Sequence, residues 1–126
     1  MRRAGRHRAV HGYRKMSRVL FICGRNRWRS PTAERIFSSC AGVECDSAGL
    51  SPDAENPVTA ELVEWAQTIF VMEKAHRAKL SARFGRSLRN KRVVCLDIPD
   101  KYQFMDPALV KLLEAKVTPL LRRFGY

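Results

Sequence analysis

The sequence lacks the features that mark several large classes of protein. No run of apolar residues approaches the ~20 residues that a helix needs to span a membrane. The four cysteines have no regular spacing, which excludes a disulfide framework and a zinc-finger pattern, and no histidine lies close enough to a cysteine cluster to suggest a metal site. Free thiols in such a chain indicate a reducing, cytoplasmic setting, with neither a metal nor a membrane among the expected partners.

Acidic residues are also scarce, because 12 Asp and Glu face 24 Lys and Arg and leave a formal net charge of +12. Residues 1–15 contain no acidic residue and carry +6 of that charge. The basic residues in this stretch are Arg2, Arg3, Arg6, Arg8, Arg14 and Lys15. Such a balance favours anionic partners without saying which. A basic arm can hold a nucleic-acid backbone, but the rest of the chain has no nucleic-acid motif, so nucleic-acid binding is the less favoured interpretation.

The length of 126 residues suits a single domain with one core. Residues 1–16 are predicted to form a disordered basic arm, and residues 17–126 a single α/β domain. The arm lacks the apolar centre of a secretory signal, and its slight likeness to a transit peptide has no amphipathic stripe to support it. Since Met16 directly precedes the first predicted strand, we favour a functional chain that begins there, with the arm as an addition.

Four stretches typical of strands alternate with helical patterns along the rest of the chain. The predicted strands are 19–22, 43–48, 68–72 and 92–96, and the second is expected at a sheet edge. The predicted helices are 30–40, 57–66, 74–84 and a last one that begins at Asp106-Pro107. This alternation predicts a parallel sheet with right-handed crossovers, whose ligands bind beyond the carboxyl ends of the strands. The polar residues expected at that edge are Cys23, Ser47, Glu73, Asp97 and Asp100.

The loop between the first strand and the first helix carries the strongest chemical signal. Cys23 stands at its start and Arg29 six positions later. A loop that ends at a helix N-terminus presents backbone N–H groups to an anion, and the same field stabilises a thiolate, so we expect Cys23 to be nucleophilic near neutral pH. Arg29 offers a two-pronged donor that matches a tetrahedral oxyanion, and Ser30 is placed to donate to the sulfur. These residues predict a site that attacks phosphorus and holds its charge.

The other cysteines, Cys40, Cys45 and Cys95, have no arginine six positions later and are most simply buried thiols. Cys23 has a structural interpretation as well, in which it is a small, buried apolar residue at the end of a strand and has no chemical role. The strand before the Cys23 loop and the helix start after it favour the chemical interpretation.

These residues resemble the low-molecular-weight protein tyrosine phosphatase family. The likeness is carried by residues 23–30 after Val-Leu-Phe-Ile, by Pro-Thr-Ala-Glu at 31–34, by Ser-Ala-Gly at 47–49, by Ile-Phe-Val-Met at 69–72 with His-Arg at 76–77, and by Asp-Lys-Tyr at 100–102. The order of the motifs, with the cysteine early and the acid late, separates this family from other cysteine phosphatases. The likeness extends over most of the chain.

The resemblance implies a three-layer, flavodoxin-like α/β fold, in which helices flank a four-stranded parallel sheet. It also implies a cofactor-free hydrolase for phosphomonoesters, acting on phosphotyrosine in proteins or on small aryl phosphates. Cys23 would form a phospho-cysteine, Arg29 would bind two phosphate oxygens, and Asp100 would protonate the leaving oxygen and then activate water. Tyr102 would flank the mouth and stack on an aryl ring. The phosphate-binding residues would be Gly24, Arg25, Asn26, Arg27, Trp28, Arg29 and Ser30, with Asn26 in an unusual backbone conformation.

The sequence departs from the family pattern in four places. Trp28 stands where the family has a second cysteine, so a protective disulfide is impossible and peroxide should inactivate the protein easily. Arg25 replaces a glycine, which puts the backbone geometry of the loop in question. Lys101 replaces a proline beside Asp100, so Asp97 stays an alternative general acid. The segment after Gly49 is shorter than usual, which predicts a shallower mouth.

Two further functions stay open beside nucleic-acid binding. The departures at Arg25, Trp28 and Lys101 would suit a phosphate-binding module with weak turnover. An arsenate reductase is the less favoured option, because Cys95 has no resolving cysteine after it.

Three side chains are assigned structural positions. Trp28 is expected to pack under the loop, Trp65 to lie in the core and His76 to lie on a helix surface.

Overall fold

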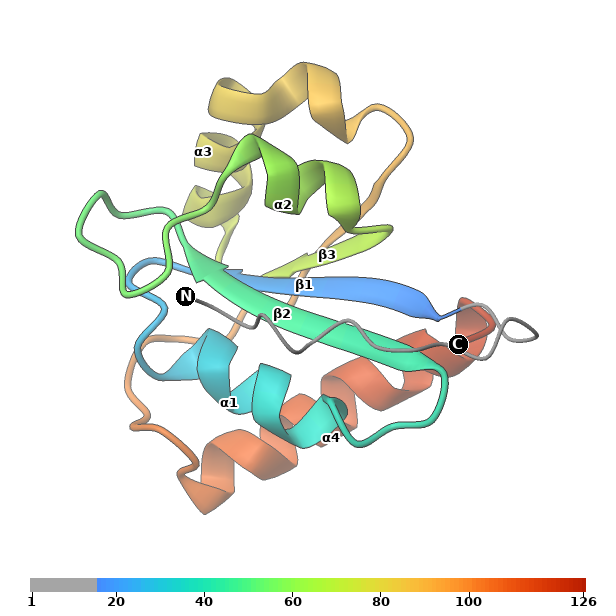
Figure 1. The fold of residues 1–126 in the computed structure, drawn as a ribbon. Coiled ribbons are helices and arrows are strands. Elements are labelled where there is room, and N and C mark those ends of the chain that lie inside the picture. The colour runs from blue at the N-terminus through green and yellow to red at the C-terminus, as the bar shows by residue number, and fades with distance from the viewer. Residues whose placement is uncertain (1–15) are drawn as a thin grey trace.

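A computed structural model describes residues 16–126, which form a four-stranded sheet between two layers of helices (Figure 1). The strands are β1 (Ser17–Cys23), β2 (Val43–Gly49), β3 (Thr68–Val71) and β4 (Arg92–Cys95), in the order β2-β1-β3-β4. All neighbouring strands are parallel. The predicted three-layer fold is confirmed, and β2 lies at an edge as expected. Apart from Met16, the predicted arm lies outside the described residues.

Two helices cover each face of the sheet (Figure 1). Helices α1 (Arg29–Phe37) and α4 (Pro107–Arg123) pack on one face. Helices α2 (Ala60–Trp65) and α3 (Lys74–Phe84), with the short 3-10 helix η1 (Gly85–Leu88), pack on the other. None of the helices within 16–126 is long and apolar enough to cross a membrane.

Capping side chains determine where two of the helices begin. Asp106 accepts a hydrogen bond from the Ala108 amide and Pro107 occupies the first turn of α4, as predicted. The predicted start of the second helix at residue 57 is wrong. Thr59 caps α2 by accepting from the Leu62 amide, so the helix begins three residues later.

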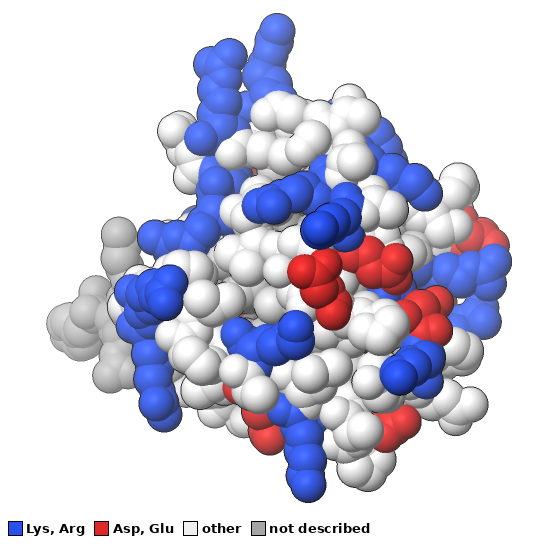
Figure 2. Space-filling model, turned by 180° about the vertical axis from the view of Figure 1, so that it is seen from behind, with Lys and Arg blue, Asp and Glu red and all other residues white. Residues whose placement is uncertain are grey.

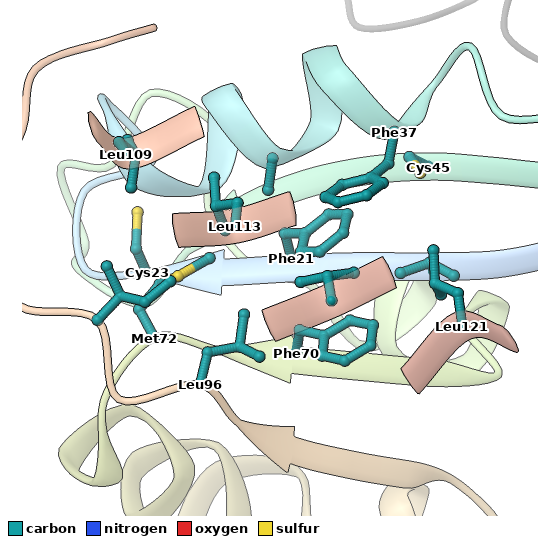
Figure 3. Packing of buried hydrophobic residues seen from close by; sticks show 14 of the residues in the cluster. Phe21, Cys23, Phe37, Cys45, Phe70, Met72, Leu96, Leu109, Leu113 and Leu121 are labelled. Atoms are coloured by element: carbon teal, nitrogen blue, oxygen red, sulfur yellow. The ribbon is translucent and has the colours of Figure 1, made fainter. Parts of the chain in front are cut away.

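The central strand β1 is buried on both faces, as its continuous apolar run predicts. Its side chains alternate between the two cores: Phe21 faces α1 and α4, whereas Leu20 and Ile22 face α2 and α3. Phe21 stacks between Phe37 and Phe70, with ring centroids 5.8 Å and 5.4 Å apart (Figure 3). This packing fixes the direction of β1 and therefore the position of the loop that follows it.

The carboxyl ends of the four strands meet at one edge of the sheet. Cys23 is in register with Gly49 of β2, and the residue before it is in register with Val71 of β3, which pairs with Cys95 of β4. The loops that leave these ends come together on the left of Figure 1. The candidate site lies there, as expected for a parallel sheet.

Candidate active site

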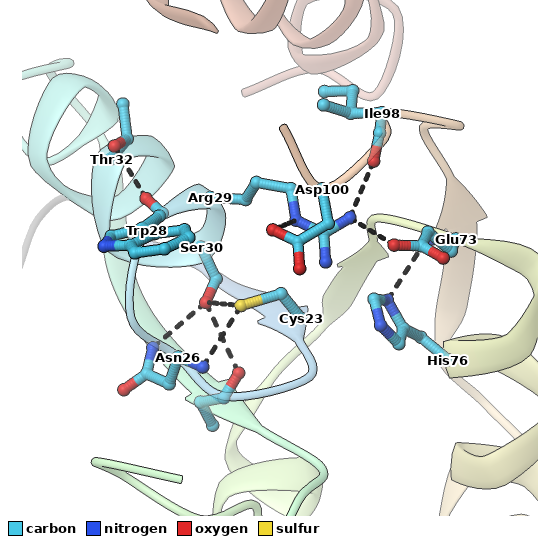
Figure 4. Close-up of polar contacts among 11 residues, drawn as sticks. Cys23, Asn26, Trp28, Arg29, Ser30, Thr32, Glu73, His76, Ile98 and Asp100 are labelled. Carbon is cyan, nitrogen blue, oxygen red and sulfur yellow. Dashed lines mark hydrogen bonds and ion pairs between the residues drawn. The ribbon is translucent and has the colours of Figure 1, made fainter. Parts of the chain in front are cut away.

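The loop after β1 wraps around the sulfur of Cys23 (Figure 4). Cys23 is buried, with 3% of its surface exposed. The Asn26 amide donates to Sγ at 3.2 Å, and the Ser30 hydroxyl lies 2.9 Å from Sγ. Asn26 has φ of 56°, the left-handed conformation that was predicted for it. Arg25 does not have a positive φ, so the loop accommodates it without a glycine there. The sulfur is therefore held by polar contacts at the base of the loop.

A buried polar network fixes the shape of this loop. The Asn26 side-chain amide donates to the hydroxyls of Ser30 and Ser47, at 3.0 Å each. Ser47 in turn donates to Glu34 Oε1 at 2.6 Å. The network ties the loop to β2 on one side and to α1 on the other, and so holds in place the residues that contact the Cys23 sulfur.

The end of β2 approaches the loop so closely that only glycine fits at residue 49. A Cβ atom added to Gly49 would lie 2.6 Å from the Gly24 carbonyl oxygen and 2.7 Å from the Ala54 Cβ. Two backbone hydrogen bonds hold the contact, from Leu50 N to Cys23 O at 3.0 Å and from the following amide to Gly24 O at 2.8 Å. The Cys23 loop therefore packs directly against the backbone at the end of β2.

Arg29 is buried at the start of α1 and has fixed partners. Its Nη1 donates to Glu73 Oε2 at 2.5 Å and to the Ile98 carbonyl at 2.7 Å (Figure 4). Its Nε lies 3.6 Å from Asp100 Oδ1. These contacts orient the guanidinium at the end of β1, where its other N–H groups can meet an anion.

Asp100, and not Asp97, shares a hollow with Cys23. Asp97 instead accepts a hydrogen bond from the Cys95 thiol at 3.4 Å, in a left-handed backbone conformation. Among the described residues, the hollow has a volume of about 370 Å³ and is lined by Cys23, Gly24, Arg25, Arg27, Trp28, Arg29 and Asp100. Tyr102 is not one of these lining residues, since it is half-buried and packs against the core on the α4 side.

The prediction that Trp28 packs under the loop is wrong. Its residue is 36% exposed and lines the hollow. The buried side chains of Asn26, Ser30 and Ser47 already fill the inside of the loop. The Trp28 carbonyl accepts from both the amide and the hydroxyl of Thr32 at 3.1 Å and 2.7 Å. Trp28 thus begins α1 with its backbone, while its indole stays partly accessible. Trp65, the last residue of α2, is half-buried and packs against the core, so its predicted core position is confirmed only in part.

The rim of the hollow carries two exposed ion pairs with the segment after β2. Arg25 Nη2 lies 3.2 Å from Asp53 Oδ2, and Arg27 Nε lies 3.7 Å from Glu55 Oε2. The hydrogen bond from Ser51 and the charge of Arg25 lower the pKa of Asp53. Glu55 N also donates to the Arg25 carbonyl at 3.1 Å. The short segment therefore supports the rim.

His76 is buried, so its predicted position on the helix surface is wrong. Its Nδ1 accepts from the Glu73 amide at 3.1 Å, while Glu73 caps α3. Burial, and next the charge of Arg29, lower the pKa of His76. The signal that could have found this position is Glu-x-x-His at a helix start, the spacing of a capping box. Within 16–126, no group of three or more His, Cys, Asp and Glu is arranged to hold a metal ion.

Comparison with known proteins agrees with this arrangement. Residues 18–98 match the family model described as low molecular weight phosphotyrosine protein phosphatase. The match to the protein-arginine-phosphatase of Bacillus subtilis (strain 168) has 30% identity over 95 residues, and its coverage is 54% of this chain and 63% of that protein. The chain therefore spans less than two thirds of this relative's length.

Solved structures share the fold at lower identity. A mutant of YwlE from Bacillus subtilis superposes with a TM-score of 0.69 at 22% identity, covering 87% of this chain and 99% of that one. Wzb of Vibrio vulnificus in complex with benzylphosphonate gives a TM-score of 0.71 at 20% identity, covering 86% and 99%. The family match extends over the whole Cys23 loop and over the strands that position it. The chain belongs to the low molecular weight phosphotyrosine protein phosphatases, a family of cysteine-based phosphatases, as its motifs predicted.

Proposed function

We propose that this protein hydrolyses phosphomonoesters, with phosphotyrosine in proteins as the favoured substrate, through a phospho-cysteine intermediate. Membership of a phosphatase family supports the reaction class. The observation that carries the mechanism is the buried Cys23 sulfur, held by Asn26 and Ser30 in the hollow that Arg29 and Asp100 also line.

The first step is attack on phosphorus. The Cys23 thiolate forms the S–P bond while the bond from phosphorus to the ester oxygen breaks, and Asp100 gives its proton to that oxygen. Arg29 binds two of the remaining phosphate oxygens, and the N–H groups at the start of α1 face the charge that develops on them. Because Glu73 and Ile98 already orient Arg29, little reorganisation is needed at that moment.

The second step releases phosphate. The Asp100 carboxylate takes a proton from water, the water oxygen attacks phosphorus, and the S–P bond breaks. Cys23 leaves as a thiolate, which the Ser30 hydroxyl 2.9 Å away can stabilise by donating a hydrogen bond. Asp100 regains its proton, so the protein returns to its starting state.

The charge of the hollow favours an aryl phosphate over a phosphoarginine. Three of its lining residues are arginines and one is an aspartate. The guanidinium of a phosphoarginine residue would bring a further positive charge into this environment, whereas a tyrosine ring is neutral and can pack on Trp28. Phosphoarginine is the second candidate, because a relative is a protein-arginine-phosphatase and because Asp100 could accept from a substrate guanidinium.

Phosphate release from two peptides of one sequence, carrying phosphotyrosine or phosphoarginine, tests the proposal. We expect the parent to prefer phosphotyrosine, Cys23→Ser to be inactive, and Asp100→Asn to lose far more rate than Asp97→Asn. Faster release from the phosphoarginine peptide would reassign the substrate. A parent that binds phosphate but turns over neither peptide, nor p-nitrophenyl phosphate under reducing conditions, would be a phosphate-binding module.

A further inference from the structure

The positive charge of the described chain is concentrated in one segment. Residues 74–92 contain eight basic side chains and no acidic one. The basic residues are Lys74, Arg77, Lys79, Arg83, Arg86, Arg89, Lys91 and Arg92. All the other described residues together carry ten basic and twelve acidic side chains, a net charge of −2. The segment is therefore a local feature that the composition of the whole domain does not explain.

Most of these side chains are exposed around α3 and along the segment that follows it, and we call this surface the basic face. It consists of Lys74, Arg77, Lys79, Arg83, Arg86 and Arg89, all on α3, η1 or the residue after η1, and all exposed. Helix α3 buries His76 and Leu80 and packs Phe84 partly against the core, while its basic and alanine side chains stay exposed. Figure 2 shows Lys and Arg spread over this face of the molecule, including its upper part, where Figure 1 places α3.

The basic face has no acidic partners among the residues that the structure describes. Four ion pairs join side chains within residues 16–126, and none of them includes a side chain from 74–92. Arg77 and Arg83 donate to the Val93 and Leu50 carbonyls, which leave their net charges in place. Residues 1–15 contain no Asp or Glu side chain to neutralise them either. The charge is thus available to a partner.

The basic face begins beside the hollow, although none of its residues lines it. Lys74 directly follows Glu73, whose carboxylate binds Arg29. At the other end of α3, Arg83 binds the carbonyl of Leu50, the residue whose amide bonds to Cys23 O. Eleven helical residues span roughly 16 Å, a length that about five residues of extended chain also cover. A peptide that leaves the hollow therefore reaches the basic face within a few residues.

We propose that the basic face docks an acidic segment of the phosphorylated protein substrate. This inference rests on the proposed function and adds to it a class of substrate, proteins with Asp and Glu near the phosphorylated residue. A protein segment fits better than a nucleic acid, because the exposed large hydrophobic side chains among the described residues, Trp28 and Phe104, lie outside α3 and η1 and offer no stacking platform there. The exposed Ala75, Ala78 and Ala82 let a peptide backbone approach between the charges.

Charge reversal with a matched control tests the docking surface. The test variant is Lys79→Glu with Arg86→Glu, and the control is Arg122→Glu with Arg123→Glu, which makes the same charge change at the exposed end of α4. The substrates are phosphotyrosine peptides with six Asp or Glu on one side or the other, and their Asn and Gln counterparts.

The test variant is expected to raise the KM for an acidic peptide by about tenfold at low salt, because charges that attracted it now repel it. Its kcat for that peptide and its rates with the amide peptide and p-nitrophenyl phosphate should stay unchanged, and the control should stay within about twofold of the parent in every assay. Equal KM values of the parent for acidic and amide peptides would overturn the proposal, and so would equal losses in test variant and control.

A binding measurement separates this proposal from the proposed function. Fluorescence anisotropy with a labelled, unphosphorylated acidic peptide reports docking without turnover. Binding by the parent that the test variant loses and the control keeps would support the docking surface, even if phosphotyrosine were not hydrolysed. Tighter binding of a single-stranded DNA with the same number of charges, lost in the same variant, would overturn the protein partner in favour of a nucleic acid.

Discussion

Two kinds of arginine surround the Cys23 sulfur, and they differ in how firmly the protein holds them. Arg29 has a side chain only 5% exposed, with a carboxylate and a carbonyl as partners. Arg25 and Arg27 have side chains 55% and 48% exposed, and their acidic partners are exposed as well. All three residues are arginines, but only the Arg29 side chain is shielded from water.

This difference separates two tasks within the site. A buried guanidinium with fixed partners is preorganised, so it can stabilise charge on a transferred phosphoryl group without reorganising. Exposed ion pairs contribute little to stability and exchange partners easily. We call the buried Cys23 and Arg29 the base of the hollow, and the exposed Arg25 and Arg27 with their acidic partners its rim. We expect the base to determine the reaction and the rim to adjust to the substrate.

The largest expected difference is between the kcat values of Arg29→Lys and Arg27→Lys. Arg29→Lys should lower kcat by about 10²–10³-fold, because an ammonium cannot make the two-pronged contact. Arg27→Lys, which keeps an exposed charge, should change kcat by less than about threefold. Hydrolysis of p-nitrophenyl phosphate measures both, and circular dichroism checks folding. Similar losses in the two variants would remove the distinction between base and rim.

A methyl group at Gly49 tests how closely β2 must pack against the Cys23 loop. Gly49→Ala should lower the free energy of unfolding by roughly 1–3 kcal/mol, since the added carbon meets the Gly24 carbonyl. Gly85→Ala is the matched control, because no atom lies within 4 Å of its added Cβ and its φ is −50°. Urea unfolding compares the two. Equal stability would mean that the loop and β2 can move apart freely.

The pH dependence of stability tests the buried contact behind the loop. Burial, then Arg29 and Lys79, lower the pKa of His76, whereas Glu73 and Asp100 oppose them. The neutral imidazole is therefore the stabilised form. Its contribution is complete above the ordinary histidine pKa of about 6.5 and is lost as the pH falls through the lower pKa of the folded protein.

Urea unfolding at about pH 7 and about pH 5 measures this effect. The parent should lose more of its free energy of unfolding over that interval than His76→Gln, which cannot titrate. The two losses would be equal if His76 were accessible to water in the folded protein.

The smallest effects are expected from the acidic partners at the rim. Asp53→Asn with Glu55→Gln should leave the urea midpoint and kcat unchanged, because exposed pairs contribute little. The KM for an acidic phosphopeptide should fall by up to about threefold, since Arg25 and Arg27 are then available to the peptide. Peptide kinetics at low and high salt measure this change. A large loss of stability would show that the rim is as rigid as the base.

Local patterns predicted the base of the site better than its surroundings. The buried run before Cys23 and the helix start after it placed the loop at the end of β1, and the parallel topology brought Asp100 to it from a distant part of the chain. The position of His76 was missed because α3 has few apolar residues and many basic ones, which is typical of a solvent-exposed helix. Its burial depends on a cap contact and on packing near Gly24, which one-dimensional periodicity does not contain.

The exposed indole in the hollow gives the protein an optical probe of its own. Trp28 is one of only two tryptophans, and the other, Trp65, ends α2 and does not line the hollow. A phosphate ester that enters the hollow changes the polarity around Trp28 and therefore its emission. With Trp65→Phe to remove the background and Cys23→Ser to prevent turnover, ligand affinities can be read by titration without any label.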